Sequence, residues 1–367
     1  MDTSNSKRYH RTKNYLFLAD IAINTLVLLV FFFSGFSLAT RNFLVHKISH
    51  YYLVVFFYTS VLSFIFYIIG LPLSFYGGYI LEHKFNLSRQ NFFSWIKHSL
   101  KQAIISLIIL SVVVEFVYFV LRNFSSTWWV WASFFWLFLS LILAKITPSI
   151  LIPIFYKYIP IDNQELKNKI FALFSQCDIK LNDVYAINLS KDTKKANAFI
   201  CGLGQNRRVV LTDTLLDNFN NEEIKTVVAH ELGHYKNRDT FKLVVGNSIL
   251  SLAAFLLVDI FFKQALASFG IIKIDDVALF PLFAFYLMVI SLALLPLQNS
   301  FSRFLETKAD AFSLKSTESA QNYISALTKL GEINLADFEP NPLIEFMLYD
   351  HPALSRRIAF AKKFNHN

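Results

Sequence analysis

Long apolar runs constrain this chain more than any other feature. Each of them has enough residues to cross the roughly 30 Å hydrocarbon core of a bilayer as a helix. The runs lie at about 15–36, 52–80, 102–121, 128–157, 243–262 and 277–297. Only 17% of the chain is charged, below the quarter or so that is typical of soluble domains. Because only helices and closed barrels satisfy their backbone groups inside lipid, we expect a mainly α-helical, multi-pass integral membrane protein with about six spans.

Basic residues indicate which ends of these runs face the cytoplasm. The N-terminal stretch and the 82–101 loop carry more Lys and Arg than the 37–51 and 122–127 loops on the opposite side. Since cytoplasmic loops are enriched in Lys and Arg, we expect the N-terminus, the polar segment 158–242 and the C-terminal region in the cytoplasm. The same bias explains the net charge of +9 without a nucleic-acid partner. The two cysteines fit a reducing compartment.

Several ionisable residues fall inside the apolar runs, where such residues usually face a bundle interior or a wet cavity. Asp20 and Asp259 lie near the ends of their runs and are expected to reach the interface. Glu115 and Lys145 suit the wall of a wet interior, although the sequence does not give them a role. Trp128 opens the fourth run and is expected to act as an interfacial anchor.

The polar segment 158–242 has a mixed helix and strand pattern. We expect an amphipathic helix, then three short strands, and then a helix that carries two histidines. These elements are expected at 164–177, 183–190, 197–201, 208–212 and about 220–236, with a turn at 202–206. Asn220 followed by Glu223 matches a capping pattern at the start of the last helix. We expect four parts along the chain. Four spans lie in 1–157, and an α+β insertion follows in 158–242. Two spans with a helical extension occupy 243–318, and a C-terminal helical region occupies 319–367.

The pentapeptide His230-Glu-Leu-Gly-His234 is the strongest chemical signal in the insertion. Residues i and i+4 lie on one helix face, so both imidazoles can bind one Zn²⁺ and leave room for water and a third protein ligand. Glu231 lies beside them, where it can take a proton from that water. This HExxH pattern is typical of zinc metalloproteases, and we favour it over two surface histidines on an amphipathic helix.

Spacing alone leaves the third ligand open. Asp239 and Glu222 are near in sequence, but neither presents itself well to the histidine face. Glu306 follows the sixth run, with Asp310 one helical turn later. This arrangement suits a carboxylate that binds metal followed by one that orients a histidine. On its own the pair is weak, because a Glu and an Asp four residues apart are more often a solvated face.

Other motifs accompany the histidine pair along the chain. They are Leu71-Pro72 with the Glu82-His-Lys-Phe-Asn-Leu loop, Ala196-Asn-Ala-Phe199, Arg208-Val-Val-Leu-Thr-Asp-Thr-Leu-Leu216, Arg303 to Asp310 with Ala311-Phe312, and His351-Pro352 with Arg357. Together with the HExxH pattern they resemble the integral-membrane CAAX prenyl endopeptidases over roughly 60–363. Eukaryotic members usually have seven spans, whereas we expect six here. We therefore favour a bacterial inner membrane, or the endoplasmic reticulum membrane if the chain is eukaryotic.

The resemblance implies a metal centre with named residues. It implies one zinc bound by His230, His234 and Glu306, with Glu231 as the catalytic base. Asp310 would lie behind a metal ligand and orient it.

The resemblance also implies a substrate-binding edge strand, with Asn197 near the scissile carbonyl. The strand residues would be Ala196, Asn197, Ala198 and Phe199. His351 and Arg357 would line the active site and help to hold the transition state or the peptide. Taken without the resemblance, Asn197 would be a turn residue and Arg357 a cation on a helix surface.

The implied activity is cleavage just after a prenylated cysteine, which releases a C-terminal tripeptide. The implied partners are a prenylated peptide or protein and the lipid bilayer, and the implied fold encloses a water-filled chamber between the membrane helices. Two alternatives stay open. One is a membrane quality-control zinc protease of the heat-shock type, whose chains resemble this one in the zinc motif but are shorter, with about four spans. The other is a non-enzymatic channel or scaffold with a residual zinc site, against which the intact zinc-site residues argue.

Overall fold

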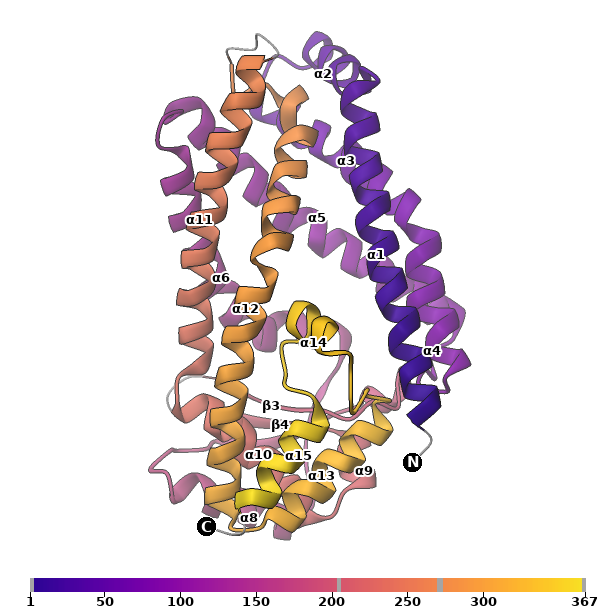
Figure 1. The fold of residues 1–367 in the computed structure, drawn as a ribbon, viewed down its shortest axis with the longest axis vertical. Coiled ribbons are helices and arrows are strands. Elements are labelled where there is room, and N and C mark those ends of the chain that lie inside the picture. Colours follow the sequence, from indigo (N-terminus) through magenta and orange to yellow (C-terminus); the bar gives the residue numbers. More distant parts are fainter. Residues whose placement is uncertain (1–2, 203–205, 269–272, 365–367) are drawn as a thin grey trace.

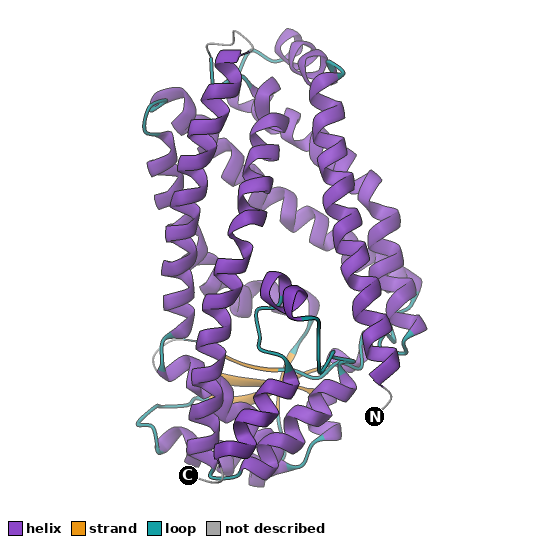
Figure 2. Cartoon of the chain, in the orientation of Figure 1, coloured by secondary structure: helices purple, strands orange, loops and turns teal. Residues whose placement is uncertain are grey.

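The computed structural model describes residues 3–202, 206–268 and 273–364. Long helices extend toward one end of the molecule, and short helices gather with a small sheet at the other (Figures 1 and 2). The helices are α1 (Thr3–Phe33), α2 (Phe36–Lys47), α3 (Tyr51–Phe75), α4 (Leu81–Lys84), α5 (Phe92–Asn123), α6 (Trp128–Ile146), α7 (Ile152–Phe155), α8 (Gln164–Ser175), α9 (Asp213–Asn218), α10 (Asn221–Lys236), α11 (Asp239–Ser268), α12 (Phe280–Thr317), α13 (Ala320–Ile333), α14 (Pro342–Leu348) and α15 (Leu354–Phe364). The strands are β1 (Tyr158–Pro160), β2 (Asp183–Ile187), β3 (Ala198–Cys201) and β4 (Arg208–Thr212).

Six helical segments of the described chain are long and apolar enough to cross a membrane. They are Ser4–Phe33, Tyr51–Lys84, Phe92–Asn123, Trp128–Phe155, Asp239–Ala267 and Val277–Thr317. Each contains or overlaps one of the six apolar runs, which confirms the expected multi-pass helical fold. Most are longer than their runs because polar residues continue the same helix. The largest extension is in α12, which runs about twenty residues past the end of its apolar run.

The long helices pack into one bundle. Helix α11 packs against both α6 and α12, α3 packs against α5, and α1 contacts α12. Tyr58, Trp128 and Val258 lie in the buried core of this bundle. Both ends of the described chain lie at the same end of the molecule as the sheet (Figure 1). This placement agrees with an even number of crossings.

The segment between the fourth and fifth spans folds around a four-stranded sheet in the order β1-β2-β4-β3. Strands β2 and β4 are parallel, and the two outer pairs are antiparallel. Leu166 and Ile170 of α8, Leu211 of β4 and Val228 of α10 pack together in the core of this small unit. Helix α10 also contacts β3 directly. The sheet therefore places an edge strand beside the helix that carries the histidine pair.

The helices and strands expected in this unit agree with the structure to within a few residues, but strand β1 and the short helix α9 were missed. Strand β1 is only three residues long and ends in proline, so it carries no alternating pattern. The strand expected at 183–190 ends at Ile187, because a 3₁₀ turn follows at Leu189–Lys191. The turn expected at 202–206 falls mostly on 203–205, which lie outside the described residues. The four-part division of the chain stays a prediction.

Asp259 and Trp128 contact each other inside the bundle, and their place at the membrane interface stays a prediction. Both side chains are buried, and the Trp128 indole N–H donates to Asp259 Oδ1 at 2.6 Å. Lys263 Nζ lies 2.8 Å from the same carboxylate. A buried indole N–H needs an acceptor, and Asp259 supplies it from the neighbouring helix. Asp20, in contrast, is exposed, and its place at the interface also stays a prediction.

Candidate metal centre and catalytic pocket

Helix α10 holds the histidine pair and begins with the expected capping box. The Asn220 side chain accepts a hydrogen bond from the Glu223 N–H at 2.9 Å, and the Glu223 carboxylate accepts one from the Asn220 N–H at 3.0 Å. Glu223 also accepts from Ser325 Oγ at 2.6 Å, which ties the start of α10 to α13. With its start fixed, the helix presents His230 and His234 on one face.

Helix α12 approaches α10 very closely at Gly233. A Cβ atom added to Gly233 would lie 3.1 Å from Ala309 Cα. Two turns earlier on α10, the Thr226 carbonyl accepts a hydrogen bond from Ser313 Oγ at 2.8 Å. This close approach of the two backbones brings Glu306 of α12 to the histidine face of α10.

Three side chains converge between the two helices. One donor atom each from His230, His234 and Glu306 lies within 4.8 Å of the others. The Nε2 atoms of His230 and His234 are 3.2 Å apart. Glu306 Oε2 lies 3.3 Å from His230 Nε2, and Glu306 Oε1 lies 3.2 Å from His234 Nε2. Within the described ranges, no other three His, Cys, Asp or Glu side chains meet in this way. Two imidazoles and one carboxylate are the ligand set of a catalytic zinc site with an open fourth position.

The donor atoms are oriented as a metal needs them. His230 Nδ1 lies 2.9 Å from Asp310 Oδ1, and His234 Nδ1 lies 3.1 Å from Asp239 Oδ2. A carboxylate partner keeps the imidazole proton on Nδ1, so each Nε2 lone pair faces the point between the helices. Glu306 Oε2 is buried and has no hydrogen-bond donor as long as the neighbouring His230 Nε2 is unprotonated, although a buried oxygen normally has a partner. The residues therefore fit a tetrahedral cation such as zinc.

The same carboxylates favour protonated histidines when no metal is bound. Burial disfavours the imidazolium of His230, but hydrogen bonds with Asp310 and Glu306 outweigh it and raise its pKa to about 9. The pKa of His234 is also raised, because Glu306 outweighs the opposing effect of burial. Metal ligands must be deprotonated, so metal binding near neutral pH releases protons from this pair.

Glu231 lines the cavity beside the histidines without joining the donor set. Burial raises the pKa of its carboxyl group, while the charges of His230 and His234 act in the opposite direction. A carboxyl group whose pKa moves toward neutrality can both accept and return a proton. The position and environment of Glu231 therefore suit the base expected from the sequence.

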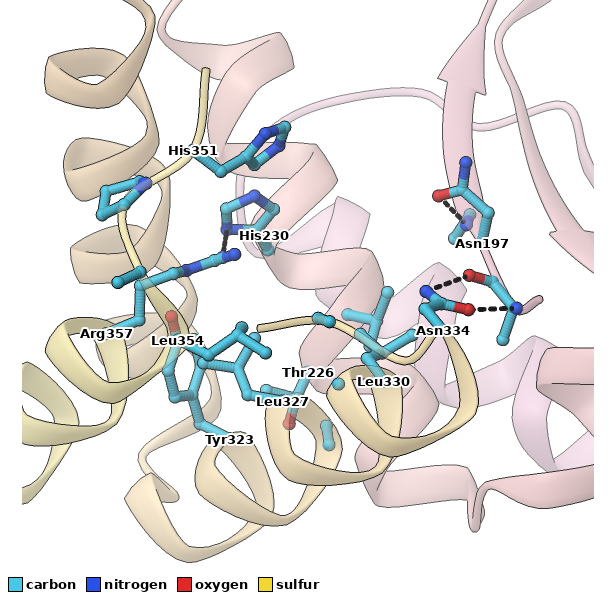
Figure 3. A pocket seen from close by; sticks show the side chains of 18 of the residues that line it. Asn197, Thr226, His230, Tyr323, Leu327, Leu330, Asn334, His351, Leu354 and Arg357 are labelled. Atoms are coloured by element: carbon cyan, nitrogen blue, oxygen red, sulfur yellow. Dashed lines mark hydrogen bonds between the residues drawn. The ribbon is translucent and has the colours of Figure 1, made fainter. Parts of the chain in front are cut away.

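His351 approaches the centre from the loop that follows α14. Its Nε2 lies 3.2 Å from Glu306 Oε1, and its Nδ1 lies 2.8 Å from Asp350 Oδ1. The side chain is half exposed, and Figure 3 shows its ring next to that of His230. The contact at Nδ1 orients the ring so that Nε2 is directed toward Glu306 at the metal centre.

Arg357 lines the cavity, but its guanidinium group is engaged by Asp310. It donates from Nε to Oδ2 at 2.9 Å and from Nη2 to Oδ1 at 2.6 Å. Nη2 also lies 3.5 Å from His230 Nδ1 (Figure 3). Such bidentate pairs fix a carboxylate in place. The geometry therefore gives Arg357 a contact with the residue that orients His230, in addition to its place in the cavity wall.

The other two candidates for the third ligand lie elsewhere. Glu222 pairs with Lys169 at 2.7 Å near the start of α10. Asp239 is buried behind His234 rather than in front of it. It reaches this place because Arg238 has a left-handed φ of +56°, which turns the chain sharply between α10 and α11. The sequence reasoning weighed Asp239 only as a ligand and missed this orienting contact.

The expected substrate strand lies at the edge of the sheet, but its regular pairing begins at Ala198. Asn197 lies just before β3 and still accepts a hydrogen bond from the Thr212 N–H at 3.0 Å. Because backbone direction alternates along an antiparallel strand, Phe199 points its backbone groups toward β4 as well. Those of Ala198 and Ile200 point outward, toward the cavity side of the edge.

Asn334 closes the beginning of this edge and was missed by the sequence reasoning. Its side-chain amide accepts from the Ala196 N–H at 2.9 Å and donates to the Ala196 carbonyl at 3.2 Å. A peptide can therefore add to the strand only beyond Ala196. Asn197 Oδ1 accepts from the Ala198 N–H at 2.8 Å (Figure 3).

A cavity of about 370 Å³ connects the metal centre with the edge strand. Its volume lies within the range of pockets that hold small ligands or peptide side chains. Polar groups of α10, the edge strand and the 349–357 segment meet apolar side chains of α13 and α15. The lining includes Asn197, Ala198, His230, Glu231, Leu327, Leu330, His351, Leu354 and Arg357 (Figure 3).

Comparison with known families covers nearly the whole chain. Residues 160–365 match the family model described as peptidase family M48. The chain belongs to peptidase family M48. Residues 2–157 match a second family model, described as the CAAX prenyl protease N-terminal region with five membrane helices. The described part of this region has four candidate spans in this M48 protein, and its remaining helix α2, with 12 residues, is too short to cross.

Relatives of this M48 protein occur in bacteria and eukaryotes. The "Uncharacterized metalloprotease YhfN" of Bacillus subtilis (strain 168) is 29% identical over 98% of this chain and 85% of its own length. The "CAAX prenyl protease 1 homolog" of Homo sapiens is 28% identical over 80% of this chain and 70% of its own. The "CAAX prenyl protease 1" of Saccharomyces cerevisiae is 28% identical over 82% and 70%. A crystal structure of S. mikatae Ste24p shares the fold, with a TM-score of 0.86 at 24% identity over 98% of this chain and 88% of that one.

Family membership settles the class of the protein. The resemblance found in the sequence motifs is confirmed, and the chain is a multi-pass membrane metalloendopeptidase that hydrolyses peptide bonds. A catalytic metal and a peptide substrate follow from that class. A non-enzymatic channel or scaffold does not agree with this membership.

Proposed function

We propose that this enzyme is zinc-dependent and cleaves prenylated CAAX-type substrates just after the prenylated cysteine, releasing the C-terminal tripeptide. One observation carries the proposal. His230 of the donor set lines the same cavity as Ala198 of the edge strand β3, in a membrane protein related to CAAX prenyl proteases.

The residues of the metal centre have three roles: they bind the metal, orient its ligands, or act as the base. A bound zinc would supply an acidified water and a polarised scissile carbonyl. Glu231 takes a proton from the attacking water and returns it to the leaving amine. Asp310 and Asp239 hold the two imidazoles in their metal-binding tautomer. Arg357 in turn holds Asp310.

The edge strand supplies the main contacts to the peptide. An extended substrate adds beside β3 and pairs with the outward backbone groups of Ile200 and with the outward carbonyl of Ala198, whose N–H donates to Asn197 Oδ1. The free NH₂ group of Asn197 then faces the scissile carbonyl, where negative charge develops during attack. His351 reaches the same oxygen from the α14 side of the cavity.

We further propose that the catalytic unit lies on the cytoplasmic side of a bacterial inner membrane. The support is the Lys and Arg bias of the loops, together with both described chain ends lying beside the sheet. Asp162 is exposed on this unit. The test places Asp162→Cys in a background where both native cysteines are replaced by serine. This cysteine should not react with a membrane-impermeant thiol reagent in intact cells, and it should react after lysis. Labelling of intact cells would reverse the orientation.

A quality-control protease of the heat-shock type is less favoured. It would share the zinc site, but the match of 2–157 to the CAAX prenyl protease N-terminal model adds membrane helices that such proteases lack. The test uses purified protein with a farnesylated CAAX peptide, the same peptide without farnesyl, and an unmodified membrane protein, with Glu231→Gln as the inactive control. We expect one cut after the cysteine and a clear preference for the farnesylated peptide. Efficient cleavage of the unmodified membrane protein alone would favour the heat-shock type.

A further inference from the structure

Helix α14 exposes its apolar side and buries its charged one. Leu343, Phe346 and Met347 are 68%, 48% and 37% exposed, while Glu345 is only 4% exposed. The three apolar residues share one helix face, because they are spaced three and four residues apart. A helix facing water would show the opposite pattern. The face formed by these three residues, here the α14 apolar face, is therefore suited to an apolar ligand.

Polar contacts on the other side hold α14 in this orientation. Asn299 Nδ2 donates to the Met347 carbonyl at 2.8 Å, and Arg303 Nη1 donates to the Glu345 carbonyl at 3.0 Å. The Glu345 carboxylate accepts from the Ala353 N–H at 3.0 Å. Helix α12 and the following loop thus fix the helix between them, so the exposure of its apolar face is a property of the fold.

The α14 apolar face is close to the catalytic centre along the chain. Met347 precedes His351 by four residues, which span at most about 14 Å when fully extended. His351 Nε2 lies 3.2 Å from Glu306, and Tyr349 between them lines the catalytic cavity. In Figure 1, α14 lies beside α12 and between the strands and the long membrane helices.

We propose that the α14 apolar face binds the isoprenoid chain of the substrate cysteine. The inference rests on the proposed CAAX-type function. In such a substrate the scissile carbonyl belongs to the prenylated cysteine itself, so the isoprenoid begins within a few bonds of the carbon under attack. An apolar surface must then adjoin the metal centre, and the segment that carries His351 provides one.

The surroundings of α14 favour a substrate chain over bilayer lipid. The guanidinium group of Arg303 lies 5.9 Å from the centre of the Phe346 ring. A charged guanidinium beside the face is costly in the hydrocarbon interior of a bilayer. It is tolerated at the rim of a wet cavity, where Arg can stack on an aromatic ring. The isoprenoid therefore lies at the boundary between the aqueous catalytic cavity and the membrane bundle.

The test compares a farnesylated peptide with the same peptide lacking farnesyl, using full-length enzyme in detergent. The double variant Leu343→Ser/Phe346→Ser should raise KM for the farnesylated peptide by roughly tenfold or more, because it removes two apolar contacts that the bound farnesyl chain would bury. Kinetics with the unprenylated peptide should not change. Phe346→Leu, which stays apolar, should behave like wild type. Phe93→Ser is the matched control, since Phe93 is 81% exposed at the start of α5.

Each outcome separates this inference from the proposed function. A wild-type enzyme without any farnesyl preference would contradict the proposed function and this inference with it. A wild-type preference that survives in the double variant would overturn the α14 site alone. Equal losses with both peptides would assign the face to folding or to bilayer contact, which also overturns it. A photoreactive farnesyl peptide on wild-type enzyme gives a check independent of variant folding: we expect labelling within 343–347, and labelling elsewhere only would refute the site.

Discussion

The metal-binding side of the cavity and its substrate-facing side are built in contrasting ways. Each histidine of α10 is held by a carboxylate that is almost fully buried, Asp310 or Asp239. On the other side, β3 leaves backbone groups unpaired, and the His351 side chain is half exposed. The first arrangement fixes the metal before substrate arrives, whereas the second is completed by the peptide. Changes on the metal side should therefore act on every substrate, and changes on the substrate side should depend on the peptide.

The largest effect is expected from removing the carboxylate donor. Glu306→Ala should lose the metal and reduce hydrolysis to background with every peptide, because two imidazoles alone make an incomplete zinc site. The measurement is metal content after purification without chelators, alongside turnover. Glu222→Ala is the matched control, since Glu222 pairs with Lys169 and should keep its zinc. Stoichiometric zinc in Glu306→Ala would mean that another residue completes the site.

The next effect separates chemistry from metal binding. Glu231→Gln should keep zinc but reduce kcat by about 10²–10⁴-fold, because the amide cannot accept the proton of the attacking water. The loss should be similar for farnesylated and unprenylated peptides. Metal analysis and kcat measured on the same preparation check that zinc is retained and that turnover is reduced. A nearly normal kcat would remove Glu231 from its role as base.

On the substrate-facing side, the strongest expectation concerns Asn197. Asn197→Asp keeps the oxygen that accepts from the Ala198 N–H but removes the NH₂ donor. Loss of a donor at the developing charge should reduce kcat by about 10²–10³-fold and change KM little. Steady-state kinetics with the farnesylated and the unprenylated peptide measure how the effect is divided between kcat and KM. An effect on KM alone would show that Asn197 positions the peptide without stabilising the transition state.

The smallest effects test whether the orienting carboxylates reinforce the metal. Asp310→Asn and Asp239→Asn should each weaken zinc affinity by about 10–100-fold, and excess zinc should restore most of the turnover. Competition with a zinc-binding dye measures the affinity. Asp310→Asn should also loosen Arg357, which Asp310 holds through two hydrogen bonds. Unchanged affinity in both variants would contradict the contrast between the two sides of the cavity.

Patterns within a single element were predictable from the sequence. Apolar length predicted the spans, and Asn220 with Glu223 predicted the start of α10. The four-residue spacing of His230 and His234 predicted their shared face. These predictions succeed because each depends only on helix geometry and on residues close together in the chain.

Contacts between elements were not predictable in the same way. Asp239 lies behind His234 only because Arg238 takes a left-handed conformation that no local pattern signals. Asn334 reaches Ala196 across 138 residues. The sequence placed 319–367 only in a helical region, and the outward direction of the apolar residues of α14 became visible through the burial of Glu345 on the same helix. Glu306 was placed by resemblance to a family, since its sequence spacing alone was ambiguous.

The uninterrupted length of α12 has a consequence for the surrounding lipid. Its 38 residues extend about 57 Å, nearly twice the roughly 30 Å of hydrocarbon that it crosses. Membrane helices respond to a thicker or thinner bilayer by tilting. Glu306 lies on α12, whereas His230 lies on α10, which packs against the sheet. The close contact at Gly233 leaves little room for sliding between them. The two helices that hold the donor atoms should therefore move together when α12 tilts, and reconstitution in short-chain and long-chain lipids should yield enzymes with similar metal affinities.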